Sequence, residues 1–551
     1  MTSRRTFIKQ AGIATAGLLT PGISSDTFAN TEDERFRQLR EAISSNASVL
    51  KIPGFAAAVV KDGKVSFVHT GGFADLDKKI PMRRDHIFPV ASVTKTFTAV
   101  TLMQYEQEGK AGMEDYVLDY PFFSVGFTPE RLQTPNVKIK HVLSHTSEGE
   151  PGANYIYNGS RYNFVYGVFE KMSGVTKHYD AFAHEVNRRI LQPLKMNDTL
   201  PGYPSDKNHL AIPRIVTTYT WDRKNQSLQP DKNLPNDHTL YPSAGMLTTI
   251  DDLAKYTHAL DNNLLLTAES YKKLTSPFVS TGGRVNPYGL GWATQQVHGH
   301  QVHWHYGYGD SYAALLVRIP REKLSFILLS NSPSASEAFY LGWGNLLNSP
   351  FAHAFFKHIV FRRNGQFSYA NVFNQQIADT DTLFYDEVYT QLLMRYYAEQ
   401  NYNEHTGEGA KLMHYLAAND PARFKKMDLS LIYQLTKLSY PSFNTQMQSA
   451  IAVYENSGYF YPDIHEHIAS CYERNGHSQM ARHWYHMLAD SKDYGEQRAV
   501  KNACNFLGNY YMAQGEIEKG RHYLWKKALY GRIMSTGTDV ASRQLKLMKL
   551  Q

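Results

Sequence analysis

The chain has 551 residues, of which 42% are hydrophobic and 20% are charged, and its formal net charge is +7. This composition is typical of a globular protein that buries a core, and it excludes a disordered chain. The excess of basic over acidic residues is small for this length and no dense Lys/Arg block occurs, which argues against nucleic-acid binding. The length predicts roughly three to four domains, or fewer if one of them is a large α/β unit.

The N-terminal segment predicts export. Ser3-Arg-Arg-Thr-Phe-Ile-Lys9 precedes a mildly apolar stretch at residues 11–19, and the segment at residues 27–29 would contain the cleavage site. This pattern is similar to a bacterial twin-arginine signal, which is read on folded proteins; the alternative is a chance Arg-Arg pair before a frayed helix. No run reaches the roughly 18 apolar residues of a membrane-spanning helix. We therefore expect a signal peptide at residues 1–29 and a periplasmic or secreted protein that has no integral membrane segment after cleavage.

The next part of the chain predicts strands at both ends of a helical region. A charged helix at residues 33–44 precedes a β-hairpin formed by residues 54–60 and 64–70 around Lys61-Asp-Gly63. Apolar residues at helical spacing predict helices at 94–108, 139–144, 162–172 and 250–260. Apolar runs between turn residues predict an antiparallel meander at 289–292, 301–304, 312–318 and 323–330, closed by a helix from about 337. The two ends should therefore share one sheet, with helices on its faces.

Beyond about residue 363 the strand signal disappears. Two segments share a tyrosine, a glycine four residues later and a small residue five further on: Tyr472/Gly476/Ala481 and Tyr511/Gly515/Gly520. The two tyrosines are 39 residues apart, near the roughly 34-residue period of tetratricopeptide helix pairs. With helical segments at 384–397 and 409–417, they predict a short α-solenoid that offers a docking surface for a protein partner.

Only two cysteines occur, Cys471 and Cys504, and both lie in this late region. An oxidising compartment would permit a disulfide between them, but two cysteines do not define a disulfide framework. A disulfide and two buried thiols both remain open.

The stretch Ser92-Val-Thr-Lys95 predicts nucleophilic chemistry. If residues 94–108 form a helix, Ser92 lies at its first turn and Lys95 lies one turn further on the same face. The unpaired N–H groups of a helix start favour the charge that develops when a hydroxyl attacks a carbonyl, and the lysine is close enough to take the hydroxyl proton. The same spacing recurs at residues 48–51 and 270–273, so the tetrad alone does not identify the site.

Further motifs follow in a consistent order. They are Pro53-Gly54, Leu143-Ser-His-Thr-Ser147, Tyr157-Asn-Gly159, Tyr288-Gly-Leu-Gly-Trp292 and His305-Tyr-Gly307. Together with Ser92 and Lys95, they resemble the serine β-lactamase and penicillin-binding-protein superfamily, in particular its class C-related branch of esterases, D-aminopeptidases and carboxypeptidases. The resemblance covers residues 53–332.

The resemblance implies an α+β fold, in which an antiparallel sheet of the β-lactamase/transpeptidase type is flanked by helices and carries an all-α insert. We place this hydrolase domain at residues 30–362. A C-terminal α-helical, tetratricopeptide-like domain follows at residues 363–551.

The resemblance also implies roles for individual residues. Ser92 would be the acylated nucleophile and Lys95 would orient and deprotonate it. Tyr157 would share the base role and activate water for deacylation. A phenol with a pKa of about 10 is a poor base at neutral pH, but a lysine cation nearby would favour its phenolate.

On the other side of the predicted cleft, His305 would aim at a substrate carboxylate or carbonyl, and Gly307 would let the backbone approach the substrate. The N–H groups of Ser92 and Tyr308 would form the oxyanion hole. Gly159 stands where the family has an asparagine, so a side-chain amide that contacts the substrate and the lysine is missing.

The sequence therefore predicts an exported serine hydrolase that forms an acyl-enzyme with a peptide, amide or ester, such as a D-amino-acid or cell-wall peptide, without a cofactor. A catalytically degenerate binding scaffold that acts through its helical repeats and a class C-like β-lactamase are the alternatives. Gly159, Glu148 in place of a common glycine and the missing Lys-Thr-Gly cation argue against β-lactam hydrolysis. A metal site among the histidines of residues 298–305 is disfavoured, because alternate strand residues point to opposite faces.

Overall fold

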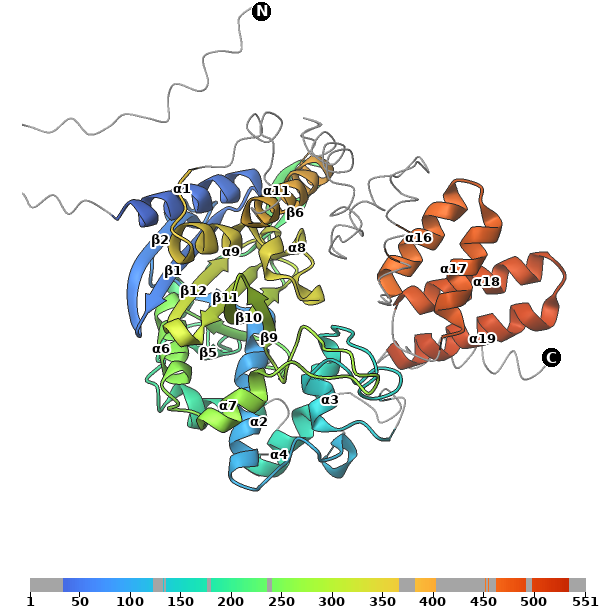
Figure 1. Ribbon diagram of the computed structural model, residues 1–551, viewed down its shortest axis with the longest axis horizontal. Helices are drawn as coiled ribbons and strands as arrows, with labels where there is room; N and C mark the ends of the chain where they lie inside the picture. Colours follow the sequence, from blue (N-terminus) through green and yellow to red (C-terminus); the bar gives the residue numbers. More distant parts are fainter. Residues whose placement is uncertain are drawn as a thin grey trace, which may run out of the picture.

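The structure is a computed structural model, which describes residues 33–121, 132, 135–175, 180–234, 240–365, 382–402, 451, 454, 462–491 and 498–534. The export signal predicted at residues 1–29 and the helix predicted at 409–417 lie outside these ranges. The described residues form a sheet with helices on both faces and a group of helices near the C-terminus (Figure 1). None of the described helices is long and apolar enough to cross a membrane.

The centre of the fold is an antiparallel sheet whose seven described strands have the order β3-β2-β1-β12-β11-β10-β9. The strands are β1 (Gly54–Lys61), β2 (Lys64–Asp75), β3 (Ile80–Pro81), β9 (Ala293–Val297), β10 (His300–Tyr308), β11 (Ala313–Ile319) and β12 (Leu324–Ser330). β1 pairs with β12, with Phe55 opposite Ser330, so the predicted shared sheet is confirmed. β11 and β12 are buried throughout, which explains why they appear in the sequence as apolar runs without alternation.

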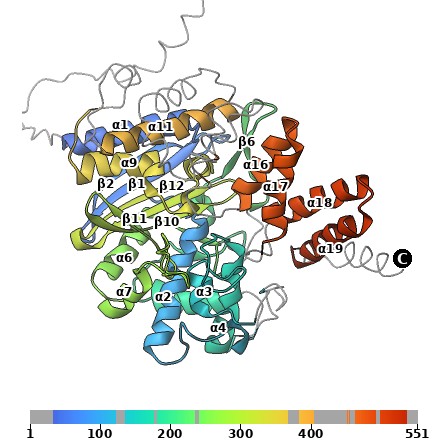
Figure 2. The same ribbon diagram turned by 45° about the vertical axis from the view of Figure 1, so that its right-hand side comes forward.

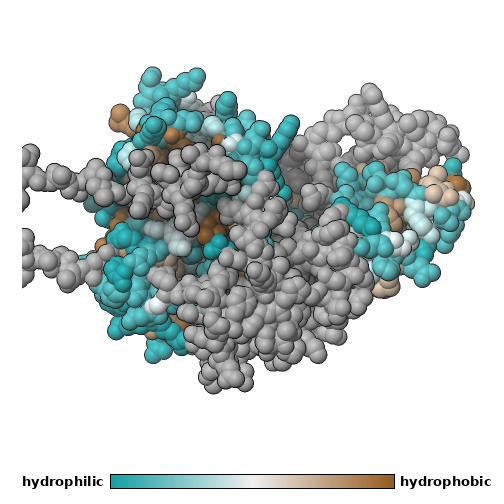
Figure 3. All heavy atoms as spheres, turned by 90° about the horizontal axis from the view of Figure 1, so that it is seen from above, coloured by the Kyte–Doolittle hydropathy of each residue, from teal (hydrophilic) through white to brown (hydrophobic). Residues whose placement is uncertain are grey.

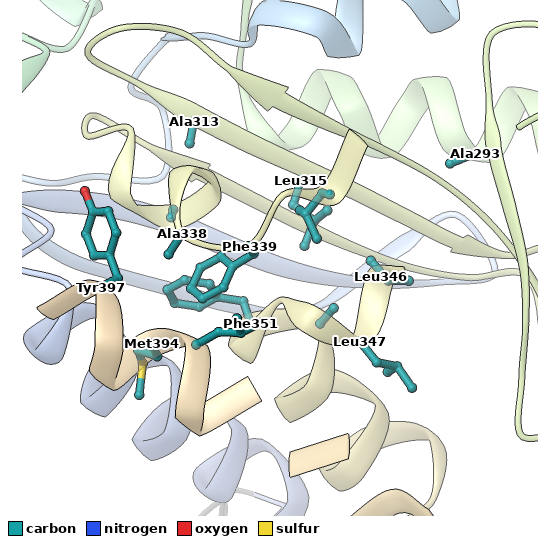
Figure 4. Packing of buried hydrophobic residues seen from close by; sticks show 14 of the residues in the cluster. Ala293, Ala313, Leu315, Ala338, Phe339, Leu346, Leu347, Phe351, Met394 and Tyr397 are labelled. Atoms are coloured by element: carbon teal, nitrogen blue, oxygen red, sulfur yellow. The ribbon is translucent and has the colours of Figure 1, made fainter. Parts of the chain in front are cut away.

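One face of the sheet is covered by α1 (Glu34–Val49), α9 (Pro350–Phe355) and α11 (Thr382–Asn401) (Figure 2). Between sheet and helices, the side chains of Phe339 and Phe351 pack into an apolar layer, and Met394 of α11 belongs to the same buried cluster (Figure 4). α11 contacts α1 and α9 although it follows the boundary predicted at residue 362, and that boundary stays a prediction.

The helix predicted from about residue 337 is wrong in position. α8 (Ser334–Glu337) ends where that helix was expected to begin, and 3-10 turns with a left-handed Gly344 (φ +96°) follow. The next helix, α9, starts at Pro350, where Ser349 accepts a hydrogen bond from the N–H of Ala352. A serine N-cap and a proline at the first helical position are specific start signals, and they place the helix better than apolar spacing does.

The opposite face carries α2 (Thr94–Gln107), α6 (Ile250–Asp261) and α7 (Ala268–Thr275). The all-α insert contains α3 (Ile139–Leu143), α4 (Tyr166–Ser173), α5 (Asp180–Val186) and the π-helical Asn187–Leu191. The described short strands form two smaller sheets. One contains β4 (Phe88–Pro89), β8 (Met246–Thr248) and β5 (Leu200–Pro201); the other pairs β6 (Tyr219–Asp222) with β7 (Ser227–Pro230) beside the end of α11, where Trp221 Nε1 donates a hydrogen bond to the Asn401 carbonyl. Two details differ from expectation. The helix predicted at 162–172 opens with a 3-10 turn at Ser160–Val165, and residues 289–292 form no strand.

The C-terminal group contains α16 (Pro462–Arg474), α17 (Ser478–Ala489), α18 (Arg498–Ala513) and α19 (Ile517–Met534), and consecutive helices pack against each other. Gly476 and Gly515 have φ values of +79° and +78° in the turns after α16 and α18. The turns explain the repeated Tyr/Gly spacing, while the tetratricopeptide-like assignment stays a prediction. Cys471 and Cys504 are both buried, and no disulfide joins them. The described part of the surface in Figure 3 is mainly hydrophilic.

Candidate active site

Ser92 lies in a 3-10 turn, Ala91–Val93, that runs directly into α2. The preceding Ala91 has φ +44°, a conformation that L-residues rarely adopt and that local packing must maintain. Strand β10 supplies this packing, since a Cβ atom at Gly307 would lie 2.2 Å from the carbonyl oxygen of Val90. Gly307 is therefore needed where β10 meets the serine turn, and its predicted role in letting the backbone approach the substrate stays a prediction.

Lys95 points back toward Ser92. Its Nζ lies 2.8 Å from Ser92 Oγ and also donates a hydrogen bond of 2.8 Å to the carbonyl oxygen of Ser243. The Ser243 N–H in turn donates to Asn163 Oδ1 at 3.0 Å, which fixes this carbonyl in place. Lys95 is 1% exposed, and burial lowers its pKa to about 7. Near neutral pH this amine is therefore partly uncharged and can accept a proton from the serine hydroxyl.

Tyr157 lies beside the same lysine, with Lys95 Nζ 5.6 Å from the centre of its ring. Burial raises the pKa of Tyr157 to about 12, although the hydroxyl groups of Ser92 and Tyr306 lower it in part. The Tyr157 hydroxyl is buried and makes no hydrogen bond of regular geometry with Ser92, Tyr306 or any other described residue. The loss of solvation therefore outweighs the expected effect of the cation. Lys95, rather than Tyr157, is the group that titrates near neutral pH.

His305 is buried under the site with both ring nitrogens engaged. Its Nε2 accepts a hydrogen bond from the Tyr288 hydroxyl, and its Nδ1–H donates to the Tyr306 carbonyl, each at 2.6 Å. Burial and the nearby Lys95 lower the pKa of His305 to about 3. It is therefore neutral and holds the surrounding tyrosines, and a contact with substrate stays a prediction.

The remaining predicted residues line the same region. A Cβ atom at Gly159 would lie 3.6 Å from Lys95 Nζ and would meet no other atom within 4 Å. An asparagine at this position would thus reach the lysine without a clash, and glycine leaves the space beside it open. Tyr308 pairs with Ala313 at the end of β10 and is 44% exposed. The oxyanion role of the Ser92 and Tyr308 N–H groups stays a prediction.

The other histidines of this hairpin have separate partners. His298 Nε2 lies 3.1 Å from Asp386, His300 Nδ1 lies 2.5 Å from Glu322 and His303 Nδ1 lies 2.9 Å from the Tyr271 hydroxyl. Within the ranges that the structure describes, no three histidine, cysteine or acidic side chains are grouped in a way that would hold a metal ion.

Sequence reasoning missed two residues of the site. The Ser243 carbonyl lies in the stretch Pro242-Ser-Ala-Gly-Met246, just before the helix predicted at residues 250–260. A backbone carbonyl carries no residue-type signal, so its contact with Lys95 becomes visible only in three dimensions. His145 lies in the Leu-Ser-His-Thr-Ser motif, which pointed to it without giving it a role.

The buried Lys95 makes a specific prediction about stability. In the folded chain its pKa is about 7, against an ordinary value of 10.5. Between these pH values the unfolded chain binds the extra proton, so the free energy of unfolding should rise with pH across this window. Below pH 7, Lys95 is charged in the folded chain, so the free energy of unfolding is lowered by the full cost of burying this charge. Lys95→Met should therefore be more stable than the wild type at pH 7, and the difference should shrink by about 2 kcal/mol at pH 9.

Urea denaturation at both pH values measures this difference, and subtraction of the two proteins cancels the other titrating groups. Lys273→Met is the matched control, because Lys273 pairs with Glu106 at the surface and is half exposed. A stability difference for Lys95→Met that is independent of pH would contradict the lowered pKa.

A serine–lysine pair at the head of a helix, beside a tyrosine and an antiparallel sheet that helices flank, defines the class of the serine β-lactamases and penicillin-binding proteins. Residues 34–347 match the family model described as Beta-lactamase, and the chain belongs to this family.

Curated relatives are similar over the same region. Penicillin-binding protein 4* of Bacillus subtilis (strain 168) is 24% identical over 344 residues, which cover 55% of this chain and 71% of the relative. Protein flp of Staphylococcus aureus (strain MW2) is 25% identical, covering 51% of this chain and 60% of the relative. D-aminopeptidase of Gluconobacter oxydans (strain 621H) is 21% identical, covering 54% and 60%. The match thus spans less than two thirds of the last two relatives.

Among solved structures, the octameric penicillin-binding protein homologue from Pyrococcus abyssi is similar with a TM-score of 0.49 and 20% identity, over 60% of this chain and 78% of that one. The penicillin-binding protein from Bacillus halodurans has a TM-score of 0.43 and 22% identity, over 52% of this chain and 94% of that one.

Proposed function

We propose that this protein is an exported serine hydrolase that forms an acyl-enzyme on Ser92. The observation that carries the proposal is the distance of 2.8 Å between Lys95 Nζ and Ser92 Oγ, together with the burial that brings the pKa of Lys95 to about 7. A base whose pKa is close to the working pH combines a usable neutral fraction with enough basicity to take the hydroxyl proton.

The reaction follows from these contacts. Ser92 Oγ forms a bond to the substrate carbonyl carbon while its proton passes to Lys95 Nζ. The bond to the leaving alcohol or amine then breaks, and the leaving group takes up that proton. Water next attacks the acyl ester and gives up a proton through Lys95 or Tyr157, and Ser92 is released with its hydroxyl restored. The N–H groups of Ser92 and Tyr308 are our candidates for stabilising the oxyanion.

The proposed substrates are peptides, amides or esters, such as D-amino-acid or cell-wall-derived peptides. Relatives whose names are penicillin-binding protein and D-aminopeptidase support this choice. The neutral His305 supplies no positive charge for a substrate carboxylate, and Gly159 supplies no amide. Both features favour general acyl transfer over β-lactam hydrolysis. The Arg-Arg segment at residues 1–29 supports twin-arginine export to the periplasm.

Covalent labelling of the full-length protein tests the proposal. A fluorophosphonate probe should modify the wild type stoichiometrically, and mass spectrometry of a digest should place the adduct on the peptide that contains Ser92. Nitrophenyl acetate should be turned over, and prior labelling should stop this turnover. An adduct on any other residue, or a protein that neither labels nor turns over the ester, would refute the acyl-enzyme proposal.

A further inference from the structure

His145 packs its ring against the ring of Tyr157. The two ring centres are 4.2 Å apart, and the planes are inclined by 33°. His145 is 3% exposed, and the rings of Tyr155, Tyr162 and Tyr288 surround it at centre distances of 6.3, 5.5 and 5.0 Å. The imidazole is thus held in an aromatic cage, and Tyr157 is one of its walls.

Hydrogen bonds fix the backbone on both sides of Tyr157 to the same histidine. The N–H of Asn158 donates to His145 Nδ1 at 3.3 Å, and the N–H of Ile156 donates to the His145 carbonyl at 2.8 Å. His145 itself has φ +54°, a costly conformation that these contacts maintain. Because Nδ1 accepts a hydrogen bond, the proton of the neutral ring is on Nε2.

The charge state of His145 is set by its neighbours. The groups that face it are Lys95 from α2, His305 from β10 and the phenols of Tyr155, Tyr157, Tyr162 and Tyr288. Burial, Lys95 and His305 all lower the pKa of His145. The imidazole therefore stays neutral while Lys95 gains and loses its proton.

We propose that His145 is a positioning residue of the hydrolase, which clamps the Tyr157 ring and the adjoining backbone against Lys95. The proposal rests on the proposed function, because the position of Tyr157 affects catalysis only if Ser92 is acylated. Without the clamp, Tyr157 moves and water enters beside Lys95. Better solvation of the ammonium then raises the pH at which Lys95 becomes an active base.

Two variants of the full-length chain separate the two parts of the clamp. His145→Asn keeps a hydrogen-bond acceptor near the position of Nδ1 and removes the ring, whereas His145→Phe keeps a ring and removes the acceptor. The matched control is His141→Asn, since His141 is also buried and accepts a backbone hydrogen bond through Nδ1, from Lys138 at 3.2 Å. His141 packs edge-on against Phe278, with ring centres 6.4 Å apart.

For nitrophenyl acetate, we expect His145→Asn to lower kcat about tenfold with little change in KM. The midpoint of the acidic limb of the pH–kcat profile should move up by about half a pH unit or more. His145→Phe should show a smaller change in the same direction, and His141→Asn should show neither change. Rates are expressed per fluorophosphonate-labelled site and thermal unfolding is recorded, so partial unfolding lowers the labelled fraction without moving the midpoint.

The outcomes distinguish the two proposals. A wild type that is not labelled on Ser92 overturns both. A labelled wild type whose kcat and midpoint are unchanged in His145→Phe and in every folded sample of His145→Asn overturns only the positioning role. If His145→Asn does not fold, the comparison of His145→Phe with the His141→Asn control decides whether His145 has the positioning role.

Discussion

Replacing Ser92 by alanine is expected to remove fluorophosphonate labelling and to lower kcat/KM for nitrophenyl acetate by about 10⁴–10⁶-fold. The alanine deletes the only hydroxyl group to which Lys95 Nζ is hydrogen-bonded among the described residues. It leaves the Ser243 carbonyl contact and the buried α2 helix unchanged, so the fold should survive. Steady-state kinetics and gel fluorescence measure the loss, and circular dichroism verifies folding.

The chain contains two controls of its own, because the same four-residue spacing occurs twice more. Lys51, three residues after Ser48, places its Nζ over the rings of Trp221 and Tyr402 at 5.3 and 5.0 Å. Lys273, three residues after Ser270, pairs with Glu106 at 2.9 Å. Ser48→Ala and Ser270→Ala should therefore retain full labelling and turnover. Labelling of Ser92→Ala at the wild-type level would contradict the assignment of the nucleophile.

The antiparallel sheet was predictable because its signals are local and consistent. The hairpin has a turn signal at Lys61-Asp-Gly63, and β11 and β12 are short apolar runs between turn residues. The order of elements placed the two ends of the domain in one sheet, whereas the pairing of β1 with β12 became known only from the structure. The prediction of a helix from residue 337 was wrong for a physical reason. Leu346 and Leu347 are buried in a short 3-10 turn, Leu346–Asn348, and not in an α-helix, so apolar spacing was a poor guide to the end of α8 and the start of α9.

The sequence predicted which residues form the site better than it predicted their protonation states. Residue types and their order identified Ser92, Lys95 and Tyr157, and the structure places all three together. Their protonation depends on burial, which no motif specifies. Burial lowers the pKa of Lys95 to about 7 and raises the pKa of Tyr157 to about 12. The same cause neutralises His305, whose position in the motif had suggested a contact with a substrate anion.

These opposite shifts make Lys95→Met the second decisive variant. We expect it to lower kcat for ester hydrolysis by about 10²–10⁴-fold, the usual contribution of a positioned general base. The activity of the wild type should rise as the pH passes through about 7, because Lys95 then loses its proton. In the variant this acidic limb should disappear, because no other group hydrogen-bonded to Ser92 Oγ titrates near neutral pH in the described part of the chain.

Tyr157→Phe tests whether the tyrosine shares the role of the base. A pH–kcat profile of Tyr157→Phe that keeps its acidic limb near pH 7, with a reduced plateau, assigns the limb to Lys95 and leaves Tyr157 a part in later proton transfer. Loss of the limb in Tyr157→Phe, together with its survival in Lys95→Met, would reverse the assignment. Because Lys95→Met is also expected to be more stable at pH 7, a loss of activity in that variant cannot be attributed to unfolding. A buried lysine that costs stability and supplies catalysis is what a general base requires, since the burial that penalises its charge is also what lowers its pKa.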